Sequence, residues 1–500
     1  MPAMLRSASA LVLLVGSAIW VPAFAQDRSI TIAVSEEPEA IEPCRALRSN
    51  IGRVIKQNVV ETLTEIDAND SSVGPRLATE WERVDDLTWR FKLRSGVKFH
   101  DGADFNAAAA AYSITRSMNK ELDCLTRTAL KYTTRVIDDT TLEVVTDVAS
   151  PILPLVMGTM LIVSPNMPDK IPAVTPIGTG PYVFGEWRRG QDLVLTRFDG
   201  YWGEKPEVEK ATYVFRTEPA VRAAMVAAGE ADIAVSITAN DADNPETDTS
   251  YLNAETAFMR IDLQIPPLDD IRVRKALNYA IDREAIRGTI LSKDVVVATQ
   301  NIVPNVNGYN PDLKPWPYDP AQAKALLAEA KADGVPIDTE ITIYGRRALH
   351  AGVVEKLEAM TAMLTDVGFN VKLVMVETAE WLELHAQPHP EGRAPNLLDI
   401  THDNSNGDAF FTVWNQYYST GRQSVLNDPE IDGLIEKASE SVNPERQELW
   451  REVFRKVFEE HVAYIPEFHM ADFSRVGPRI NFTPLLTTSS EIQIGRITFK

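Results

Sequence analysis

Four charged side chains that follow expected strands have the chemistry to hold a small charged solute. Arg346 and Arg347 come directly after an alternating, β-branched strand at 340–344, and a guanidinium is the best side chain for binding a carboxylate. Glu36 and Glu37 follow the opening strand of the chain, where their carboxylates could meet a cationic group of a ligand. The alternative for the two glutamates is a solvated loop.

Three histidines raise the question of a metal site. His385 and His389 are four residues apart, which is one helical turn, and His402 follows nearby. Pro388 and Pro390 oppose a helix at this point, so we expect scattered surface histidines and no metal site of the protein itself. A chelated metal carried inside a small organic ligand stays open.

The sequence contains no catalytic motif. Gly-x-Ser-x-Gly, His-Glu-x-x-His and the phosphate-binding Gly-x-x-x-x-Gly-Lys-Ser/Thr are all absent. Ser117 and Lys120 match Ser-x-x-Lys, but the two motifs that accompany it in penicillin-binding enzymes are missing. We therefore expect no enzyme, no catalytic residue and no cofactor, with a secreted enzyme as the remote alternative.

Charge and length narrow the class of protein. The 500 residues hold 71 acidic and 50 basic side chains, a formal net charge of −21, which would repel nucleic acid and anionic lipid. The length predicts two or three packed units. Only two cysteines are present, Cys44 and Cys124, and they form either a disulfide or two buried thiols.

The first 25 residues are typical of a cleavable export signal. Arg6 precedes an apolar run at 11–21, and Ala23-Phe24-Ala25 offers the small residues of a cleavage site. The run is too short to anchor the chain in a bilayer, which needs roughly 20 apolar residues. No cysteine follows the cleavage site for lipid attachment, so we expect a soluble periplasmic protein that is not lipid-anchored.

The mature chain alternates predicted strands and helices, which indicates an α/β protein. A strand at 340–344, a helix at 352–367 and a strand at 370–376 form an expected βαβ unit with parallel strands. We also expect single helices over 51–63 and 269–287. Further helices are expected at 106–118, 219–229, 319–332, 428–441 and 444–460.

Eight segments carry a resemblance to the solute-binding component of the peptide/nickel class of ATP-binding cassette (ABC) importers, solute-binding protein family 5. They occur in the order of the family and span nearly all of the mature chain. The segments are GPRLATEW at 74–81, LTWRFKLRSGVKFHDG at 87–102, GTGPY at 178–182, YWGEKP at 201–206, GEAD at 229–232, DIRVRKALNYAIDR at 270–283, GYNPDLKP at 308–315 and YDPAQAK at 318–324.

The resemblance implies a two-lobed clamshell of the periplasmic binding protein type II, cluster C kind, with an inserted subdomain. Mapped on this sequence, lobe I would comprise residues 26–60, 177–265 and 470–500. The inserted subdomain would be 61–176 and lobe II 266–469. The ligand would be enclosed between the lobes.

The resemblance also implies ligand contacts. Peptide-binding relatives have an arginine near Arg346 and Arg347 for the peptide carboxylate, and an aspartate that pairs with the amino terminus, a role open to Asp403. His402 and Asp408 lie in the same segment, but this segment lacks the Trp and Pro typical of many peptide binders. Trp414 could stack on a ligand. The alternatives are a turn role for Asp403 and core packing for Trp414.

The expected function is that of a monomeric periplasmic protein that captures a small peptide or peptide-like carboxylated solute and delivers it to an inner-membrane ABC permease. The alternatives are an opine, an oligosaccharide or chelated nickel on the same fold, or a solute sensor without import. No nucleic acid partner is expected.

Overall fold

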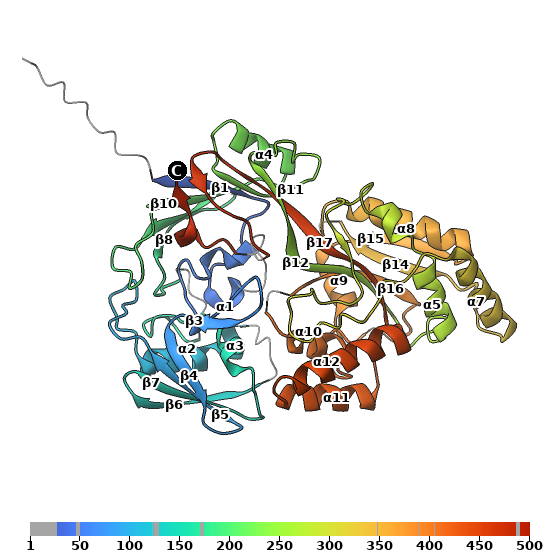
Figure 1. The fold of residues 1–500 in the computed structure, drawn as a ribbon, viewed down its shortest axis with the longest axis horizontal. Helices are drawn as coiled ribbons and strands as arrows, with labels where there is room; N and C mark the ends of the chain where they lie inside the picture. Colours follow the sequence, from blue (N-terminus) through green and yellow to red (C-terminus); the bar gives the residue numbers. More distant parts are fainter. Residues whose placement is uncertain are drawn as a thin grey trace, which may run out of the picture.

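A computed structural model describes residues 28–500 except 47–50, 123, 125–129, 171–174, 348, 390, 405 and 487–490. The predicted export signal, residues 1–25, lies outside the described residues. The main feature is an 11-stranded mixed sheet (Figure 1). In sheet order its strands are β15 (Val371–Val376), β14 (Ile341–Arg346), β16 (Asn396–Asp403), β12 (Asp248–Ile261), β17 (Tyr464–Val476), β11 (Ile233–Ile237), β1 (Ser29–Val34), β10 (Lys210–Phe215), β9 (Asp192–Arg197) and β8 (Tyr182–Arg188), with β13 (Val296–Val297) on β17.

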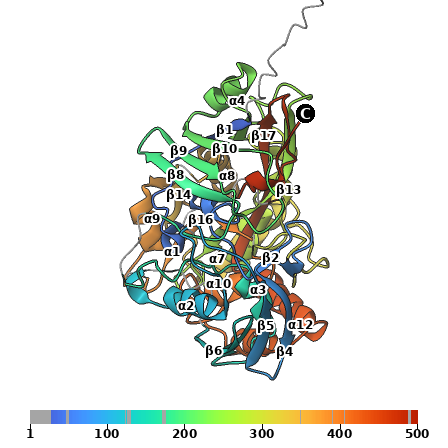
Figure 2. The ribbon, with the colours of Figure 1, turned by 90° about the vertical axis from the view of Figure 1, so that its left-hand side faces the viewer.

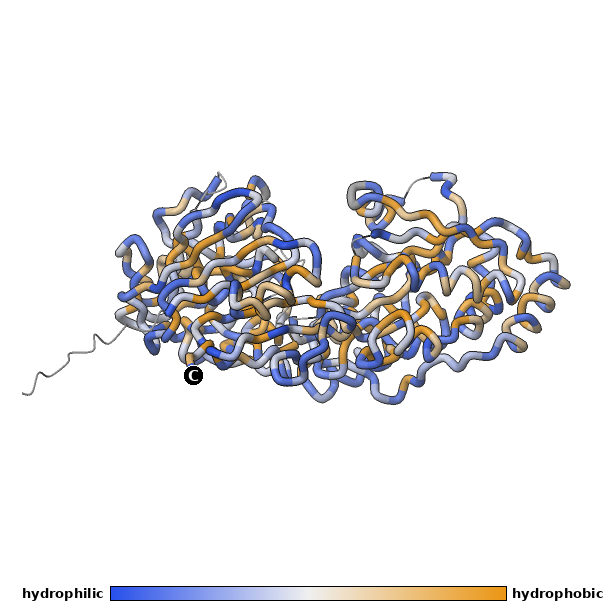
Figure 3. The backbone as a smooth tube through the Cα atoms, turned by 90° about the horizontal axis from the view of Figure 1, so that it is seen from above, coloured by the Kyte–Doolittle hydropathy of each residue, from blue (hydrophilic) through white to orange (hydrophobic). Residues whose placement is uncertain are grey.

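The two long strands β12 and β17 connect two lobes. They pair antiparallel over most of their length, and register shifts between Leu252 and Thr256 and between Ala257 and Phe258 interrupt the ladder. On one side β17 continues to β11 and β1, and on the other β12 continues to β16 and β14. We call the half with β1 and β8–β11 lobe I and the half with β14–β16 lobe II. Figure 3 shows the two lobes joined by a narrower waist.

Helices cover both lobes. Lobe I carries α1 (Pro43–Ala46), a 3-10 turn at Ile51–Ile55, and α4 (Pro219–Ala227). Lobe II carries α5 (Ile271–Tyr279), α6 (Arg283–Ile286), α7 (Pro320–Ala332), α8 (Val353–Val367), α9 (Thr378–His385), α10 (Phe410–Gln416), α11 (Pro429–Glu440) and α12 (Glu445–Arg455), which a turn of π-helix at Lys456–Glu460 continues. None of the helices within the described residues is long and apolar enough to cross a bilayer.

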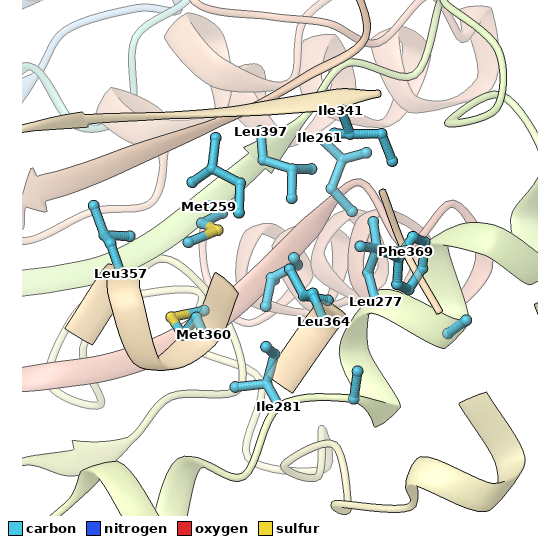
Figure 4. Packing of buried hydrophobic residues seen from close by; sticks show 14 of the residues in the cluster. Met259, Ile261, Leu277, Ile281, Ile341, Leu357, Met360, Leu364, Phe369 and Leu397 are labelled. Atoms are coloured by element: carbon cyan, nitrogen blue, oxygen red, sulfur yellow. The ribbon is translucent and has the colours of Figure 1, made fainter. Parts of the chain in front are cut away.

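The expected βαβ unit is confirmed in lobe II. Strands β14 and β15 pair in parallel from Ile341↔Val371 to Arg346↔Val376, and α8 crosses between them. Leu357, Met360 and Leu364 of α8 are fully buried against the sheet, as Figure 4 shows. A second core lies on the other side of the lobe, where α10, α11 and α12 pack their aromatic side chains on β16 and β17.

A separate four-stranded antiparallel sheet with its own core forms a small subdomain beside lobe I. Its strands are β4 (Ala78–Arg83), β5 (Thr88–Leu93), β7 (Thr141–Thr146) and β6 (Tyr132–Asp138), with α2 (Ala107–Ser117) and α3 (Leu153–Met157) (Figure 2). Asn106 caps α2 through its side chain, as expected. Short pairs complete the fold: β2 (Thr64–Ile66) with β3 (Val73–Pro75), and β18 (Ile480–Asn481) with β19 (Thr498–Phe499). A disulfide joins Cys44 and Cys124.

The expected helix over 51–63 is wrong beyond residue 55. The carbonyl oxygens of Asn58 and Val59 accept hydrogen bonds from the backbone of Tyr182 and Gly180, at 2.9 and 3.1 Å, so they are not available to a helix. Gly180 allows this approach, because a Cβ there would lie 2.3 Å from the oxygen of Asn58. Val54, Ile55 and Val59, whose spacing suggested a helix, are nevertheless buried.

The single helix expected over 269–287 is two helices, α5 and α6. Asp282 ends the first part and caps the second, since its side chain accepts a hydrogen bond from the backbone of Ala285 at 3.0 Å. Arg283 is 4% exposed and donates from Nε to the carbonyl of Pro466 at 2.6 Å, which draws α6 onto β17. The residue boundaries predicted for the lobes and the subdomain stay a prediction.

Candidate ligand-binding site between the lobes

The lobes contact each other through a direct ion pair. Arg53, in the 3-10 turn of lobe I, donates from Nη2 to Oδ2 of Asp403 at 2.5 Å. The turn belongs to lobe I because its neighbours Val54 and Ile55 pack into the core around β1. Asp403 is the last residue of β16 in lobe II. The side chains of Arg53 and Asp403 are 6% and 17% exposed, so the pair is largely withdrawn from water.

Arg346 lies at the same junction. It is the last residue of β14, half-buried, with its guanidinium 5.1 Å from the ring centre of Trp381 in α9. Its buried Nε has no hydrogen-bond partner among the described residues. Burial lowers the pKa of Arg346, and the negative charges of Glu36, Glu255 and Asp399 act in the opposite direction. Glu36 follows β1 in lobe I and Asp399 belongs to β16 in lobe II, so Arg346 experiences negative charge from both lobes.

Arg347 lies in the turn that follows β14, away from this junction. It lines an open groove of about 670 Å³ on the surface formed by α8 and β15, together with Glu358, Thr361 and Met375. The structure therefore separates the two arginines that the sequence placed together.

The two glutamates of the first loop are also separated. Glu37 accepts a hydrogen bond from the backbone of Gly190 at 3.0 Å and lies 3.6 Å from Nη1 of Arg189, so it holds the β8–β9 turn. Glu36 is exposed and is the one that faces Arg346.

The histidines have structural partners. His402 contacts Oγ1 of Thr412 through Nε2 at 2.8 Å, and His389 approaches the carbonyl of Ser424 at 3.3 Å. His385 is buried and stacks on Trp381, and burial, with the nearby charge of Arg260, keeps its pKa well below the usual range. Across the described ranges, no three His, Cys, Asp or Glu side chains are grouped to hold a metal ion.

Asp408 lies in the interior of lobe II, and Trp414 is partly buried on α10. Asp408 is 3% exposed, and its two carboxylate oxygens accept hydrogen bonds from Arg446 at 2.7 and 3.0 Å. It also accepts from the backbone of Phe410 at 2.9 Å, at the start of α10. Trp414 donates to Oγ of Ser439 at 3.0 Å and so joins α10 to α11. Because their polar atoms are engaged within lobe II, neither residue belongs to the ligand-binding site that we propose.

A buried charge cluster lies behind Arg346. Nζ of Lys356 in α8 is 2.7 Å from Oδ1 of Asp399 and 2.5 Å from Oε2 of Glu467, and all three side chains have no exposed surface. Burial raises the pKa of Asp399, and it raises the pKa of Glu467 to about 7. The cluster supplies the negative charge on the inner side of Arg346.

Two residues at the junction, Arg53 and Trp381, had no signal in the sequence. Arg53 was placed within an expected helix and has its partner 350 residues further along the chain. Trp381 follows a strand end at β15, and only the packing of α9 against β14 brings it under Arg346. The position of Trp381 a few residues after the end of β15 was the one feature of the sequence that could have suggested it.

The fold and the charged junction between two lobes are those of a solute-binding protein, and comparison with known proteins gives the family. The family model for bacterial extracellular solute-binding proteins, family 5 (middle region), matches residues 72–427. The chain therefore belongs to solute-binding protein family 5, as the sequence motifs indicated, and its family consists of binding proteins.

Relatives are similar over most of their length. Heme-binding protein A of Haemophilus influenzae is 24% identical over 91% of this chain and 89% of its own. The dipeptide-binding protein of Escherichia coli is 27% identical over 79% of this chain and 80% of its own. The nickel-binding periplasmic protein of Escherichia coli is 27% identical over 88% and 89%.

Solved structures share the fold. NikA from Brucella suis, in complex with Fe(III)-EDTA, superposes with a TM-score of 0.81 at 24% identity, covering 94% of this chain and all of that one. The binding protein AgaA from A. tumefaciens R10, in complex with agropinic acid, gives a TM-score of 0.77 at 21% identity, covering 94% and 99%. The expected two-lobed α/β fold is thereby confirmed.

Proposed function

We propose that the protein captures a small carboxylated solute, such as a peptide-like acid, between its two lobes and delivers it unaltered to an ABC permease of the inner membrane. The observation that carries this proposal is Arg346. It lies at a strand end where negative charge from both lobes acts on its guanidinium, and its buried Nε lacks a partner among the described residues. A carboxylate is the group that a guanidinium fork binds best.

The arrangement of the lobes supports capture. A ligand held between two lobes loses its contact with water when they close, so that polar and apolar contacts form together. The ligand favours closure only if it binds the closed form more tightly than the open form. Trp381 is buried, stacks on His385 and lies under the guanidinium of Arg346, so it helps to hold that guanidinium in place.

The names of the relatives do not choose the ligand. They are named for heme, dipeptides, nickel and glutathione, so this family holds very different solutes on one fold. We further propose that the chain is exported to the periplasm, acts as a monomer and has no catalytic residue. The choice of a carboxylated solute rests on Arg346, not on the relatives.

Replacing Arg346 with alanine tests the proposal. Wild-type protein is screened by thermal shift against dipeptides, N-acetyl dipeptides, glutathione, opines and carboxylate chelates. A bound member at a hundredfold excess over Kd should stabilise the protein by about 3 kcal/mol. In Arg346→Ala, calorimetry should show affinity for a carboxylated solute lowered by about 10- to 100-fold, because a charge-assisted hydrogen bond is lost.

Arg347→Ala is the matched control, since it removes the same charge from the neighbouring residue but in the groove of α8 and β15. It should leave the affinity within about twofold of wild type. No stabilisation by any carboxylated member of the panel, or equal losses in the two variants, would refute the proposed anchor.

A further inference from the structure

We infer that Arg53 is a specificity-determining residue: from lobe I it occupies the carboxylate of Asp403 in lobe II, so that the cleft selects carboxylated solutes with no ammonium group at this position. This inference rests on the proposed function and deepens it, because it narrows the class of ligand. Asp403 is the acidic residue at the end of β16 that could otherwise receive a ligand cation.

The ion pair is built into the structure. Arg53 and Asp403 are in hydrogen-bond contact at 2.5 Å, and both side chains are largely buried. Arg53 also experiences a second negative charge, since its guanidinium helps to lower the pKa of Glu491. Glu491 is itself paired with Lys56 at 2.7 Å, so the segment that carries Arg53 is held by two ion pairs.

A ligand ammonium group would have to displace Arg53 to reach Asp403. The displaced guanidinium would lose its hydrogen bond to Asp403 while still largely buried, and removing one partner of a buried ion pair is strongly destabilising. A solute without an ammonium group avoids this exchange. The Arg53–Asp403 pair also spans the two lobes, so breaking it would oppose closure around the ligand.

Arg346 and Asp403 differ in whether a protein group already occupies their charged side chain. The buried Nε of Arg346 has no partner among the described residues, whereas the carboxylate of Asp403 has a protein cation within hydrogen-bond distance. A carboxylate group of the ligand therefore has a place to bind, and the corresponding ammonium position is already filled. Glu36 is the counter-charge of Arg346 across the junction and does not restore the ammonium position at Asp403.

Arg53→Gln tests the inference by leaving Asp403 open to a ligand cation. Calorimetry compares matched dipeptides with free and N-acetylated amino termini, for example Ala-Ala and Met-Leu. Wild type should bind the acetylated forms at least as tightly as the free forms. In Arg53→Gln, the ratio of affinities should shift at least tenfold toward the free-amino forms. No such gain for any pair, or a tenfold free-amino preference in wild type, would overturn the inference.

Two further variants serve as controls. Lys205→Gln removes one positive charge from an exposed ion pair with Asp199, remote from the junction, and should leave the ratio unchanged. Adding Asp403→Asn to Arg53→Gln should abolish the gain, because the carboxylate that receives the ammonium group is gone. Retention of the gain in the double variant would also contradict the inference.

A reciprocal variant covers the case in which Arg53→Gln does not fold. Asp403→Asn alone removes the carboxylate that pairs with Arg53 and should raise the affinity for N-acetyl-Ala-Glu over N-acetyl-Ala-Gln at least tenfold relative to wild type; an unchanged ratio would refute the inference. Failure of the proposed function looks different. Wild type would then bind no carboxylated solute at all, whereas normal carboxylate binding with an unshifted ratio would refute only the role of Arg53.

Discussion

At the scale of single residues, lobe II buries a group of three charged side chains. Lys356, Asp399 and Glu467 form a fully buried cluster, and one oxygen of each carboxylate has no hydrogen-bond partner in the described part of the chain. Such clusters stabilise a fold little compared with apolar packing. Its position behind Arg346 gives it a second consequence, since Asp399 adds negative charge beneath that guanidinium.

The raised pKa of Glu467 predicts a pH dependence of stability. Burial raises this pKa from an ordinary 4.5 to about 7, so the folded protein keeps the proton to higher pH than the unfolded chain. The stabilisation from this group is complete below pH 4.5 and is lost as the pH rises through about 7. In Glu467→Gln this loss should be absent, a relative gain on the order of 3 kcal/mol at pH 8.

Denaturant unfolding of wild type and Glu467→Gln at pH 5 and pH 8 measures this difference. Burial lowers the pKa of His350 to about 3 and of His469 to about 4, which acts in the opposite direction with pH. These histidines are common to both proteins, so their effect cancels in the comparison. Glu358→Gln, at an exposed site on α8, controls for the substitution itself. A wild-type-minus-variant difference that does not change between the two pH values would contradict the prediction.

At the scale of elements, the irregular segment around residue 308 packs as closely as any helix. Gly308 has a φ of +103°, and a Cβ there would lie 2.7 Å from Cβ of Trp450 in α12 and 2.9 Å from Cβ of Ala409. The neighbouring Asn307 is hydrogen-bonded through its backbone to Gly407 and Ala409, at 3.1 and 2.9 Å. The segment thus joins α12 to the start of α10, which explains why it is ordered without regular structure.

Gly308→Ala should lower the free energy of unfolding by about 2 to 4 kcal/mol, as the sum of left-handed backbone strain and an overpacked contact. Gly334→Ala is the matched control, because Gly334 has a φ of +87° but no atom within 4 Å of its added Cβ. It should cost only the backbone strain, about 1 kcal/mol. Equal losses in chemical denaturation would show that the contact with Trp450 adds nothing.

At the scale of the whole molecule, one covalent link and two long strands connect the parts. Strands β12 and β17 pass through both lobes, so any opening of the lobes must bend these strands or shift their pairing. The register shift between Leu252 and Thr256 lies in this ladder and interrupts its hydrogen bonds. The bend of the molecule is therefore expected at this interruption.

The disulfide between Cys44 and Cys124, with a sequence separation of 80, closes a loop that contains strands β4 and β5 of the small sheet. Closing a loop of this length restricts the unfolded chain by about 4 kcal/mol in the entropic account. The Cys44→Ser/Cys124→Ser variant should therefore unfold at lower denaturant concentration, with a loss of about 2 to 5 kcal/mol. Wild-type protein with its disulfide reduced should unfold at the same denaturant concentration as the variant, because both lack the Cys44–Cys124 link. A variant as stable as the oxidised wild type would contradict the prediction.

The alternation of apolar residues along the sequence was sufficient to locate the strand that carries Arg346. The strand before Arg346 was expected at 340–344 and is confirmed as β14, but it runs on to Arg346, because β-branched alternation reports a strand without fixing its last residue. Arg347 and Glu37 were expected to act beside Arg346 and Glu36. In the structure Arg347 lines the groove of α8 and β15, and Glu37 is bonded to the β8–β9 turn. Their roles as ligand contacts stay predictions.

Contacts between residues far apart in the chain could not be predicted from the sequence pattern. Asp408 was expected among the ligand contacts, and the structure pairs it with the buried guanidinium of Arg446. Arg53 lies in the first part of the segment expected as a helix, where the structure has a 3-10 turn, and its partner Asp403 is 350 residues further along the chain.

The sequence by itself determined the family, the α/β class and the βαβ unit, because motifs and hydrophobic periodicity are properties of neighbouring residues. Only the tertiary structure decided which charges remain open to a ligand. That depends on partners distant in the chain, such as Arg53 and Asp403, whose meeting is a consequence of how the two lobes pack.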